Sequence, residues 1–489
     1  MTSIEFPEAA RARSASKVGS ALCAWDCGVS ARVVADMMGW AEVGFVVLAS
    51  VVAKYLYIFL VLEHTTQTEP YLLAGIACAL LFGHFQWNRG LGEIAVLQQG
   101  ARQWRSVLGS LLLAFLVLIA TAYVFKLSTL FSRGWLITWF MLACAMLVVA
   151  RAFSRYLLVS LAKTDGFQRR VAVASFGGPT QSLQQAIERE PSTRLVGTFV
   201  IDPVQIGARA NDPANSVAPL AQLIEAGKEI DELIIRSSSL TCEQLSVLLD
   251  ELSVLPVDIW LSTGDVALDL PIYRLGRVGG LNLMQVRTRP IGGWGLIIKQ
   301  LIDYTFAGIG LLVSTPLFLA IAVAIKLESS GPVFFRQRRH GCNEREITVF
   351  KFRTMTVAED GDNVKQATRN DPRITRVGRF LRETSIDELP QLINVLRGEM
   401  SLVGPRPHAL VHNEYYRSRV SRYSNRHKVK PGITGLAQIN GLRGETDTPE
   451  KMHQRVEMDI HYVNNWSIWL DLKILALTPI FGLLHRNAF

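Results

Sequence analysis

Two adjacent carboxylates, Asp387 and Glu388, are the most informative chemical group in the sequence. They lie within Thr384–Gln391, in a basic part of the chain. One such carboxylate can act as a nucleophile while its neighbour binds a metal ion. Ser385 and Glu388 also fit a capping box, which is an ordinary helix start. Pro390 instead favours a helix that begins at the proline, so that both carboxylates lie just ahead of the helix dipole.

Basic and amide side chains elsewhere in the same region suit the oxygens of a diphosphate. Phosphoryl transfer depends on positioning and neutralising those oxygens with arginine, lysine and usually a divalent cation. A single arginine is more often a solvated charge, but Arg406 lies between two prolines that stiffen its backbone. The candidates for phosphate or substrate binding are Gln337, Lys351, Arg353, Arg382, Arg406 and Arg443.

The composition indicates a membrane section joined to soluble domains, and these parts must position the groups named above. Of the 489 residues, 49% are hydrophobic and 19% are charged. This is too apolar for an ordinary soluble protein and too charged for a bundle of membrane helices alone. The formal net charge is +9, and most of the excess lies in residues 327–489. A basic domain beside a membrane suggests anionic headgroups, phosphates or nucleic acid as partners.

Four apolar segments in the first third each approach the length needed to cross a bilayer as a helix. They are Val43–Leu62, Tyr71–Trp87, Ser106–Phe125 and Trp135–Phe153. Arginine and lysine are concentrated before the first segment, between the second and third, and after the fourth. The positive-inside rule therefore places both ends of this bundle on the cytoplasmic side.

Residues 170–285 alternate between strand-like and helix-like segments, which predicts a small parallel α/β domain. The expected strands are Arg170–Ser175, Leu195–Ile201, Glu232–Arg236 and Val257–Leu261, and the expected helices are Gln181–Glu190, Leu220–Ala226 and Cys242–Leu255. After the first strand, Gly177-Gly178 replaces the G-x-G-x-x-G that a dinucleotide site needs. We therefore expect a structural or regulatory domain.

A fifth apolar run, Tyr304–Ile325, is long enough to cross the membrane and has Ser314-Thr315-Pro316 at its midpoint. Crossing would place the basic C-terminal region outside the cytoplasm. Proline removes a backbone donor and breaks or kinks a helix, and the neighbouring hydroxyls can bond carbonyls at the bend. We therefore predict a re-entrant helical hairpin over 304–325, broken at Ser314 and Pro316.

Several long motifs of the last 194 residues, taken in order, resemble the catalytic domain of the bacterial polyprenyl-phosphate sugar-1-phosphate transferases. The matching motifs are Phe350–Met355, the block around Asp387 and Glu388, Val403–Pro407, Lys430–Gly441 and Tyr462–Lys473. The layout of the whole chain resembles the large subgroup of undecaprenyl-phosphate glucose phosphotransferases. The implied domains are a cytoplasmic segment (1–42), a four-helix transmembrane domain (43–153), a Rossmann-like α/β domain (154–290) and a mostly α-helical monotopic transferase domain (296–489).

The resemblance implies transfer of a hexose 1-phosphate from a UDP-sugar to undecaprenyl phosphate, with release of UMP, as the first membrane step of exopolysaccharide or capsule repeat-unit synthesis. Asp387 would form a covalent phosphosugar intermediate, and Glu388 and Asp459 would bind Mg2+. The expected location is the bacterial inner membrane, with the catalytic domain on the cytoplasmic face. The expected partners are the donor, the lipid acceptor and the bilayer, without nucleic acid, and a homodimer is compatible with this layout.

Glucose is the expected sugar, and galactose is the alternative within the same family. A membrane-anchored nucleotide-sugar dehydratase shares the layout, but residues 170–285 lack its glycine-rich fingerprint and Tyr-x-x-x-Lys pair. A processive glycosyltransferase would use Asp360-Gly361-Asp362 as a metal site, although this polar stretch better fits a solvated loop. A non-enzymatic scaffold for polysaccharide assembly is the remaining alternative.

Overall fold

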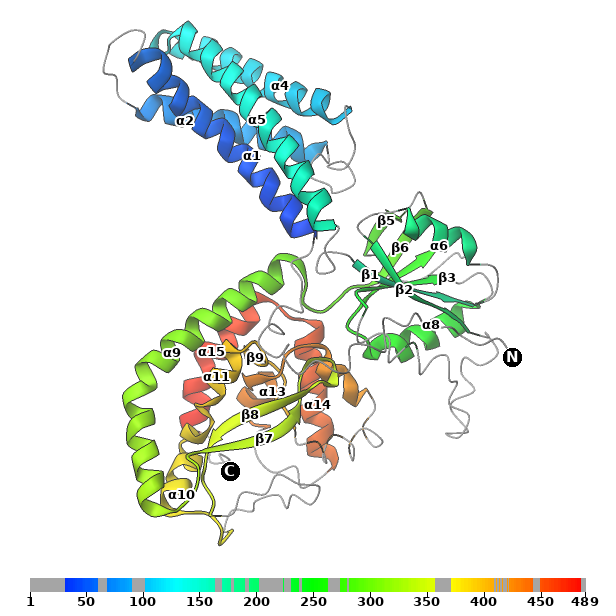
Figure 1. Ribbon diagram of the computed structural model, residues 1–489, viewed down its shortest axis with the longest axis vertical. Coiled ribbons are helices and arrows are strands. Elements are labelled where there is room, and N and C mark those ends of the chain that lie inside the picture. The colour runs from blue at the N-terminus through cyan, green and yellow to red at the C-terminus, as the bar shows by residue number, and fades with distance from the viewer. Residues whose placement is uncertain are drawn as a thin grey trace. The chain divides into compact units, whose positions relative to one another are not determined.

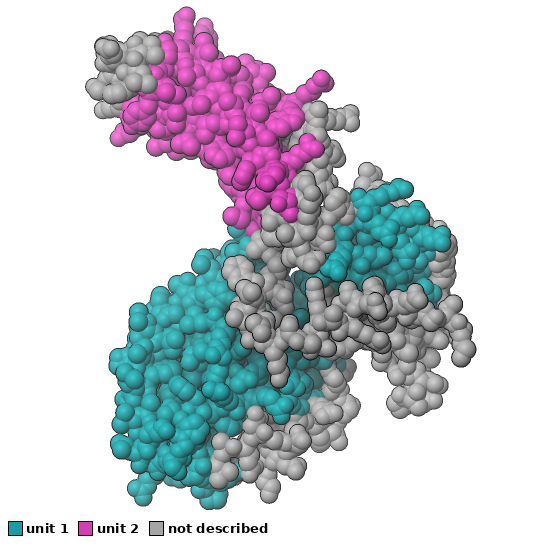
Figure 2. All heavy atoms as spheres, in the orientation of Figure 1, with its two compact units in different colours: residues 1–27, 169–489 teal, residues 28–168 magenta. Residues whose placement is uncertain are grey.

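The structure is a computed structural model. It describes residues 31–59, 68–89, 102–162, 169–176, 180–189, 193–201, 223, 230–236, 240–262, 273–278, 281–356, 371–408, 410, 413, 416, 420, 422–442 and 449–484. Two compact units divide the chain (Figure 2). One unit is residues 28–168, and the other joins residues 1–27 to residues 169–489.

Four long helices are described in the unit of residues 28–168, and each overlaps one of the four apolar segments of the sequence, although the first helix begins at Ala31, twelve residues before the predicted segment. They are α1 (Ala31–Lys54), α2 (Glu69–Asn88), α4 (Arg102–Val124) and α5 (Arg133–Ala162), with the short turns η4 (Tyr55–Phe59) and η5 (Leu127–Leu130). Each is long and apolar enough to cross a membrane. Inside the bundle, Arg151 Nη2 donates to Glu42 Oε2 and Gln86 Oε1, both at 2.9 Å. Buried charges require partners of this kind.

The α/β domain contains a six-stranded sheet of order β2-β1-β3-β4-β6-β5 (Figure 1). Its strands are β1 (Arg169–Ser175), β2 (Thr193–Val200), β3 (Glu232–Arg236), β4 (Asp258–Ser262), β5 (Arg274–Val278) and β6 (Leu281–Arg287). The four predicted strands are present and parallel, whereas the antiparallel pair β5 and β6 was not predicted. The predicted helix 220–226, apart from Leu223, and Gly177-Gly178 lie outside the described residues.

Two helices cover opposite faces of this sheet, because successive residues of a strand point to opposite sides. Helix α6 (Gln181–Glu188) packs on the face of Val171 and Val173. Helix α8 (Cys242–Glu251) and the turn η9 (Leu252–Val254) pack on the face of Ala172 and Ala174. The sheet is therefore the middle layer of three.

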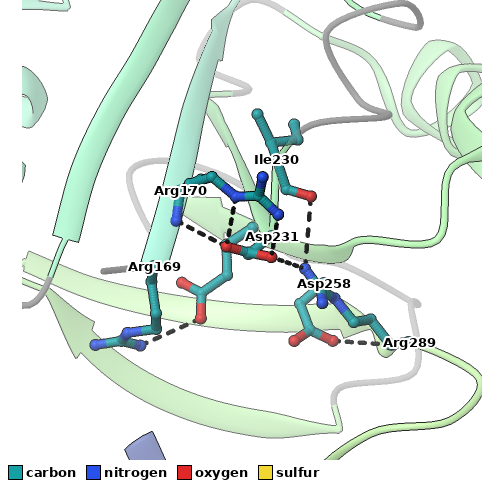
Figure 3. A network of polar contacts seen from close by, with 7 residues as sticks. Arg169, Arg170, Ile230, Asp231, Asp258 and Arg289 are labelled. Carbon is teal, nitrogen blue, oxygen red and sulfur yellow. Dashed lines mark hydrogen bonds and ion pairs between the residues drawn. The ribbon is translucent and has the colours of Figure 1, made fainter. Parts of the chain in front are cut away.

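Polar contacts gather at the amino ends of the parallel strands, around Asp231 (Figure 3). The Asp231 carboxylate accepts from the backbone N–H of Arg170 at 2.9 Å and from Arg289 Nη2 at 2.9 Å. Asp258 Oδ1 accepts from the backbone N–H of Arg289 at 2.8 Å. Burial raises the pKa of Asp231, but its bonds to Arg170 and the charge of Arg289 outweigh burial, so the net shift is downward. The first strand and the segment after the last strand are thus fastened to one carboxylate.

The C-terminal domain is mostly helical. Its helices are α9 (Gly293–Glu328), α10 (Arg376–Glu383), α11 (Gln391–Leu396), α13 (Leu436–Ile439), α14 (Pro449–Asn464) and α15 (Ile468–Leu484), with the turns η10 (Cys342–Glu344), η11 (Ile386–Glu388) and η12 (Tyr423–Lys428). The antiparallel strands β7 (Phe334–His340) and β8 (Glu346–Phe352) form one small sheet. The parallel strands β9 (Ser401–Val403) and β10 (Gly432–Thr434) form another. A core that includes Val395, Tyr462 and Ile474 joins α9, α11, α13, α14 and α15 to the strands β8 and β9.

Helix α9 is a bowed helix along one side of this domain, and the 36-residue helix continues through Pro316 (Figure 1). Ala307 in its first half is buried against the core around α11, and Ile325 in its second half is buried beside Phe352 and Leu381. Ser314 Oγ donates to the carbonyl of Gly310 at 2.7 Å, a bond that bends helices. Both ends of α9 therefore contact one domain, and the bend occurs without the predicted break.

Candidate active site

Asp387 and Glu388 lie in the turn η11, between α10 and α11. Ser385 precedes this turn with φ 58° and forms no side-chain cap, so the capping-box interpretation is wrong. Pro390 occupies the N-cap of α11, one position before the predicted place. Asp387 is 8% exposed and Glu388 is 7% exposed. The two carboxylates are therefore buried just ahead of a short helix, as the proline indicated.

Glu388 is held by two cations. Lys351 Nζ, from β8, donates to Glu388 Oε1 at 2.7 Å. Arg406 donates through both Nη atoms, and its Nη1 lies 2.9 Å from Glu388 Oε2. Such two-pronged guanidinium–carboxylate pairs are strong and directional. Burial lowers the pKa of Lys351, although the charge of Glu388 opposes that shift. The structure thus joins three predicted site residues into one cluster.

The Asp387 carboxylate is in a different situation. Within the described part of the chain, no hydrogen-bond donor is bonded to it. Burial and the negative charge of Glu388 raise its pKa. The positive charges of Lys351, Arg406 and Arg382 oppose this rise, and the net shift of the pKa is upward. A carboxylate that is surrounded by cations but bonded to none is available to attack an electrophile.

Arg406 lies in a turn whose backbone is fixed at several points. The carbonyl of Pro405 accepts from the backbone N–H of Gly432 at 3.0 Å. The carbonyl of Arg406 accepts from Arg426 Nη2. A Cβ at Gly432 would lie 2.1 Å from the backbone nitrogen of Gly404, so only glycine permits this close approach of β9 and β10. The guanidinium is therefore presented on a rigid frame.

Arg339 is a site residue that the sequence analysis missed. It donates to the carbonyl of Pro407, and the charges of Arg406, Glu388 and Asp387 act on it. Burial lowers its pKa to about 10, so it remains a cation at neutral pH. Gln337 Oε1 accepts from Arg339 Nη2 at 2.8 Å, which makes Gln337 the support of this arginine. The alternation of side chains along a strand could have revealed Arg339, because it is two residues after Gln337 and such residues share one face of a strand.

The remaining predicted phosphate ligands lie in different surroundings. Arg382, on α10, is close enough to Asp387 to influence its pKa. Arg353 is 5% exposed and donates to the carbonyls of Ser329 and Ser330 at 2.8 and 2.7 Å, so it fastens the end of α9. Arg443 lies outside the described residues. Of the two that are described, Arg382 lies near the carboxylate pair and Arg353 binds the end of α9 instead.

Asp459, the predicted second magnesium ligand, forms a buried ion pair. Its Oδ2 lies 2.7 Å from Arg426 Nη2, and the two side chains are 3% and 1% exposed. Burial raises the pKa of Asp459, and the charges of Arg426 and Arg455 oppose the rise. No group of three or more metal-binding side chains occurs among the described residues. The Asp387–Glu388 pair still suits Mg2+, which often takes one or two carboxylates and completes its shell with substrate phosphates.

Comparison with known proteins places this cluster in a family. A family model described as bacterial sugar transferase matches residues 294–485. The chain is 40% identical over 405 residues to the UDP-glucose:undecaprenyl-phosphate glucose-1-phosphate transferase of Escherichia coli K12. The aligned region covers 79% of this chain and 85% of that protein. The chain belongs to the bacterial sugar transferase family. The resemblance found in the sequence is thereby confirmed.

Two other relatives cover more of the chain. The protein of the same name from Xanthomonas campestris is 36% identical over 86% of this chain and 86% of its own length. The undecaprenyl-phosphate glucose phosphotransferase of Komagataeibacter xylinus is 36% identical over 86% of this chain and 78% of its own length. A model described as CoA-binding domain matches residues 90–263, which include part of the α/β domain. The sugar transferase family and the five long apolar helices among the described residues make this a multi-pass membrane protein.

Proposed function

We propose that the protein transfers glucose 1-phosphate from UDP-glucose to undecaprenyl phosphate and releases UMP. One observation carries this proposal: Asp387 is buried, without a hydrogen bond from any described residue, beside Glu388, which is held by Lys351 and Arg406. The relatives named for this reaction support the choice of donor and acceptor. Galactose 1-phosphate is the alternative outcome of the test, because the described site residues do not distinguish the two sugars.

The reaction proceeds in two displacements. A carboxylate oxygen of Asp387 attacks the β-phosphorus of UDP-glucose and forms an acyl-phosphate bond. The bond from that phosphorus to the bridging oxygen breaks, and UMP leaves with the electron pair. An oxygen of undecaprenyl phosphate then attacks the same phosphorus, the acyl-phosphate bond breaks, and Asp387 is restored as a carboxylate. The product is undecaprenyl diphosphate glucose.

Cationic side chains supply the electrostatic part of this mechanism. Arg406, Arg339 and Lys351 surround the carboxylates and neutralise charge on the transferred phosphate and on the leaving UMP. Glu388 would hold Mg2+, which when bound supplies further neutralisation of the diphosphate. Asp459 is not assigned as a ligand, because it lies on α14 in its own buried pair with Arg426, whereas Glu388 is adjacent to the nucleophile Asp387.

We infer that the transferase domain is monotopic and lies on the cytoplasmic face of the inner membrane. The contacts of both ends of α9 with one domain support re-entry, because a helix that crossed the bilayer would separate its ends. The exposed apolar side chains near the bend, including Leu312 at 75% and Val313 at 74% exposure, suit a lipid environment. The basic loops of the bundle support the cytoplasmic orientation.

The test uses the purified full chain with Mg2+, undecaprenyl phosphate and a panel of UDP-sugars. We expect UMP release with UDP-glucose, and an adduct on Asp387 when the acceptor is omitted. Asp387→Asn should abolish both signals, whereas Asp371→Asn, at another acidic residue of the same domain, serves as the matched control. UMP release by Asp387→Asn at the wild-type rate would refute the mechanism. Release with UDP-galactose alone would refute the choice of sugar.

A further inference from the structure

The first turns of α9 bond directly to β9, which leads into the turn that carries Arg406. Lys299 Nζ donates to the carbonyl of Val403 at 3.0 Å, and Asp303 Oδ1 accepts from the backbone N–H of Leu402 at 3.0 Å. Lys299 and Asp303 are each 5% exposed. Their spacing of i and i+4 places them on one helix face. One face of the membrane helix therefore holds two successive residues of β9.

The charge of Lys299 is balanced within the same cluster. Its Nζ lies 2.7 Å from Asp471 Oδ2, and the two side chains are 6% and 4% exposed. The hydroxyl of Tyr462 lies 2.7 Å from Asp471 Oδ1 and 3.0 Å from the carbonyl of Val403. Trp466 Nε1 donates to Asp471 Oδ2 at 3.1 Å. Side chains from α9 and α14 thus meet at the carbonyl of Val403, which also accepts from Ser401 Oγ at 2.9 Å. Asp471, from α15, pairs with both Lys299 and Tyr462.

Stability alone is a poor explanation for this cluster. Replacement of a buried ion pair by apolar residues of similar volume is often neutral or stabilising, because the desolvation of both charges offsets their attraction. A carbonyl next to an active-site turn, however, can be held in a fixed direction only by a donor. Lys299 supplies such a donor to Val403, and Asp471 makes its buried charge tolerable.

Small displacements of Val403 would reach the catalytic cluster. Arg406 is three residues further along the chain, and it meets Glu388 with two N–H donors in a planar fork. Gly404 lies between Val403 and Arg406 and donates its backbone N–H to the carbonyl of Thr434 at 2.9 Å, so the turn that follows β9 is also bonded to β10. A fork that must meet two oxygens tolerates little displacement.

We propose that Lys299, together with Asp471 and Tyr462, positions Arg406, so that the membrane helix itself sets the geometry of the phosphate-binding arginine. The inference rests on the proposed role of Arg406 in binding the diphosphate. In this role the three residues act on Arg406 through the backbone of Val403, which Lys299 and Tyr462 contact directly. The membrane helix is then part of the active-site scaffold as well as the anchor.

A double-mutant cycle tests this positioning role on the full chain. Lys299→Met/Asp471→Leu removes the ion pair as a unit, and Tyr462→Phe removes a single oxygen and keeps the packing. Each change is made in the wild type and in Arg406→Lys, which keeps the charge but loses the fork. kcat and KM for UDP-glucose are measured from UMP release, and Tm is measured in parallel. For variants whose turnover is too slow to measure, the same cycle is repeated in Asp387→Asn enzyme, and the Kd of UDP-glucose is measured instead.

We expect each change to lower kcat/KM by about 10-fold in the wild type, because small misplacements of catalytic groups are costly. In Arg406→Lys the added loss should shrink to about twofold, since coupled residues are not additive. Trp466→Phe removes a bond to Asp471 without touching Val403 and should leave both constants within about twofold.

Two results would overturn the inference: equal losses in both backgrounds, or wild-type kcat/KM in a folded Lys299→Met/Asp471→Leu variant. A different result would point elsewhere. Wild-type UMP release by Arg406→Lys, with unchanged donor affinity, would refute the role of Arg406 in the proposed function, whatever Lys299 does.

Discussion

Asp459→Asn separates two roles for a carboxylate that the sequence placed in a metal site. In the structure Asp459 is the partner of Arg426, and Arg426 also donates to the carbonyl of Arg406. The substitution keeps the shape of the side chain and removes its charge. Arg426, which is 2% exposed, would then be a buried cation without its carboxylate.

The expected cost is large because both partners are almost fully buried and their atoms lie 2.7 Å apart. Removal of one partner of such a pair costs about 3–5 kcal/mol, since the other charge remains desolvated. For a domain of this size that corresponds to a fall of roughly 6–20 °C in Tm. Arg426→Met/Asp459→Leu should recover most of this loss, because no unpaired charge remains.

The assay combines thermal unfolding of the detergent-solubilised chain with the Mg2+ dependence of UMP release. We expect Asp459→Asn to lower Tm and to leave the Mg2+ concentration for half-maximal activity unchanged at temperatures where the protein is folded. Glu388→Gln is the comparison, and it should raise that concentration because Glu388 is the proposed ligand. An unchanged Tm together with a raised Mg2+ requirement in Asp459→Asn would refute the structural role and restore Asp459 as a metal ligand.

Three further predictions concern single side chains. Lys351→Met removes a cation that lowers the pKa of Asp387. Because attack needs the ionised carboxylate, the acid limb of the pH profile of kcat/KM should move to higher pH. The profile is measured between about pH 5 and 8, and an acid limb at the wild-type position would contradict this prediction. Gln337→Leu removes the acceptor that orients Arg339. The loss of about 1 kcal/mol of hydrogen-bond energy should raise KM for UDP-glucose about fivefold. Gln337→Glu is the control, and an unchanged KM in Gln337→Leu would argue against the binding of UDP-glucose by Arg339. Asp231→Asn should lower the free energy of unfolding of the α/β domain by about 1–2 kcal/mol, measured by denaturant titration of the Trp260 signal, and an unchanged midpoint would contradict the network in Figure 3.

The sequence predicted the centre of the site because the centre lies in contiguous motifs. Asp387 and Glu388 are adjacent, and Pro390 indicated where the next helix begins. Lys351 and Arg406 belong to other motifs, and only the fold brings their side chains to Glu388. Residue type and local rigidity were sufficient to select them.

Long-range pairing explains what the sequence could not predict. Arg353 is two residues after Lys351 and would share its face if β8 continued, but the strand ends at Phe352 and Arg353 binds the end of α9 instead. Asp459 and Arg426 belong to distant segments, so nothing local reveals their pairing. Helix α9 bends without breaking because contacts at both of its ends hold it, and those contacts are tertiary.

The Asp231 network has a consequence for how the chain can be rearranged. The α/β domain is entered at Arg170 and left at Arg289, and both residues are bonded to the same carboxylate (Figure 3). A module whose two ends meet at one point can be excised, and a short flexible linker can rejoin the flanking segments without stretching either of them. Deletion of residues 170–289 therefore offers a shortened transferase in which the contribution of this module to catalysis can be measured directly.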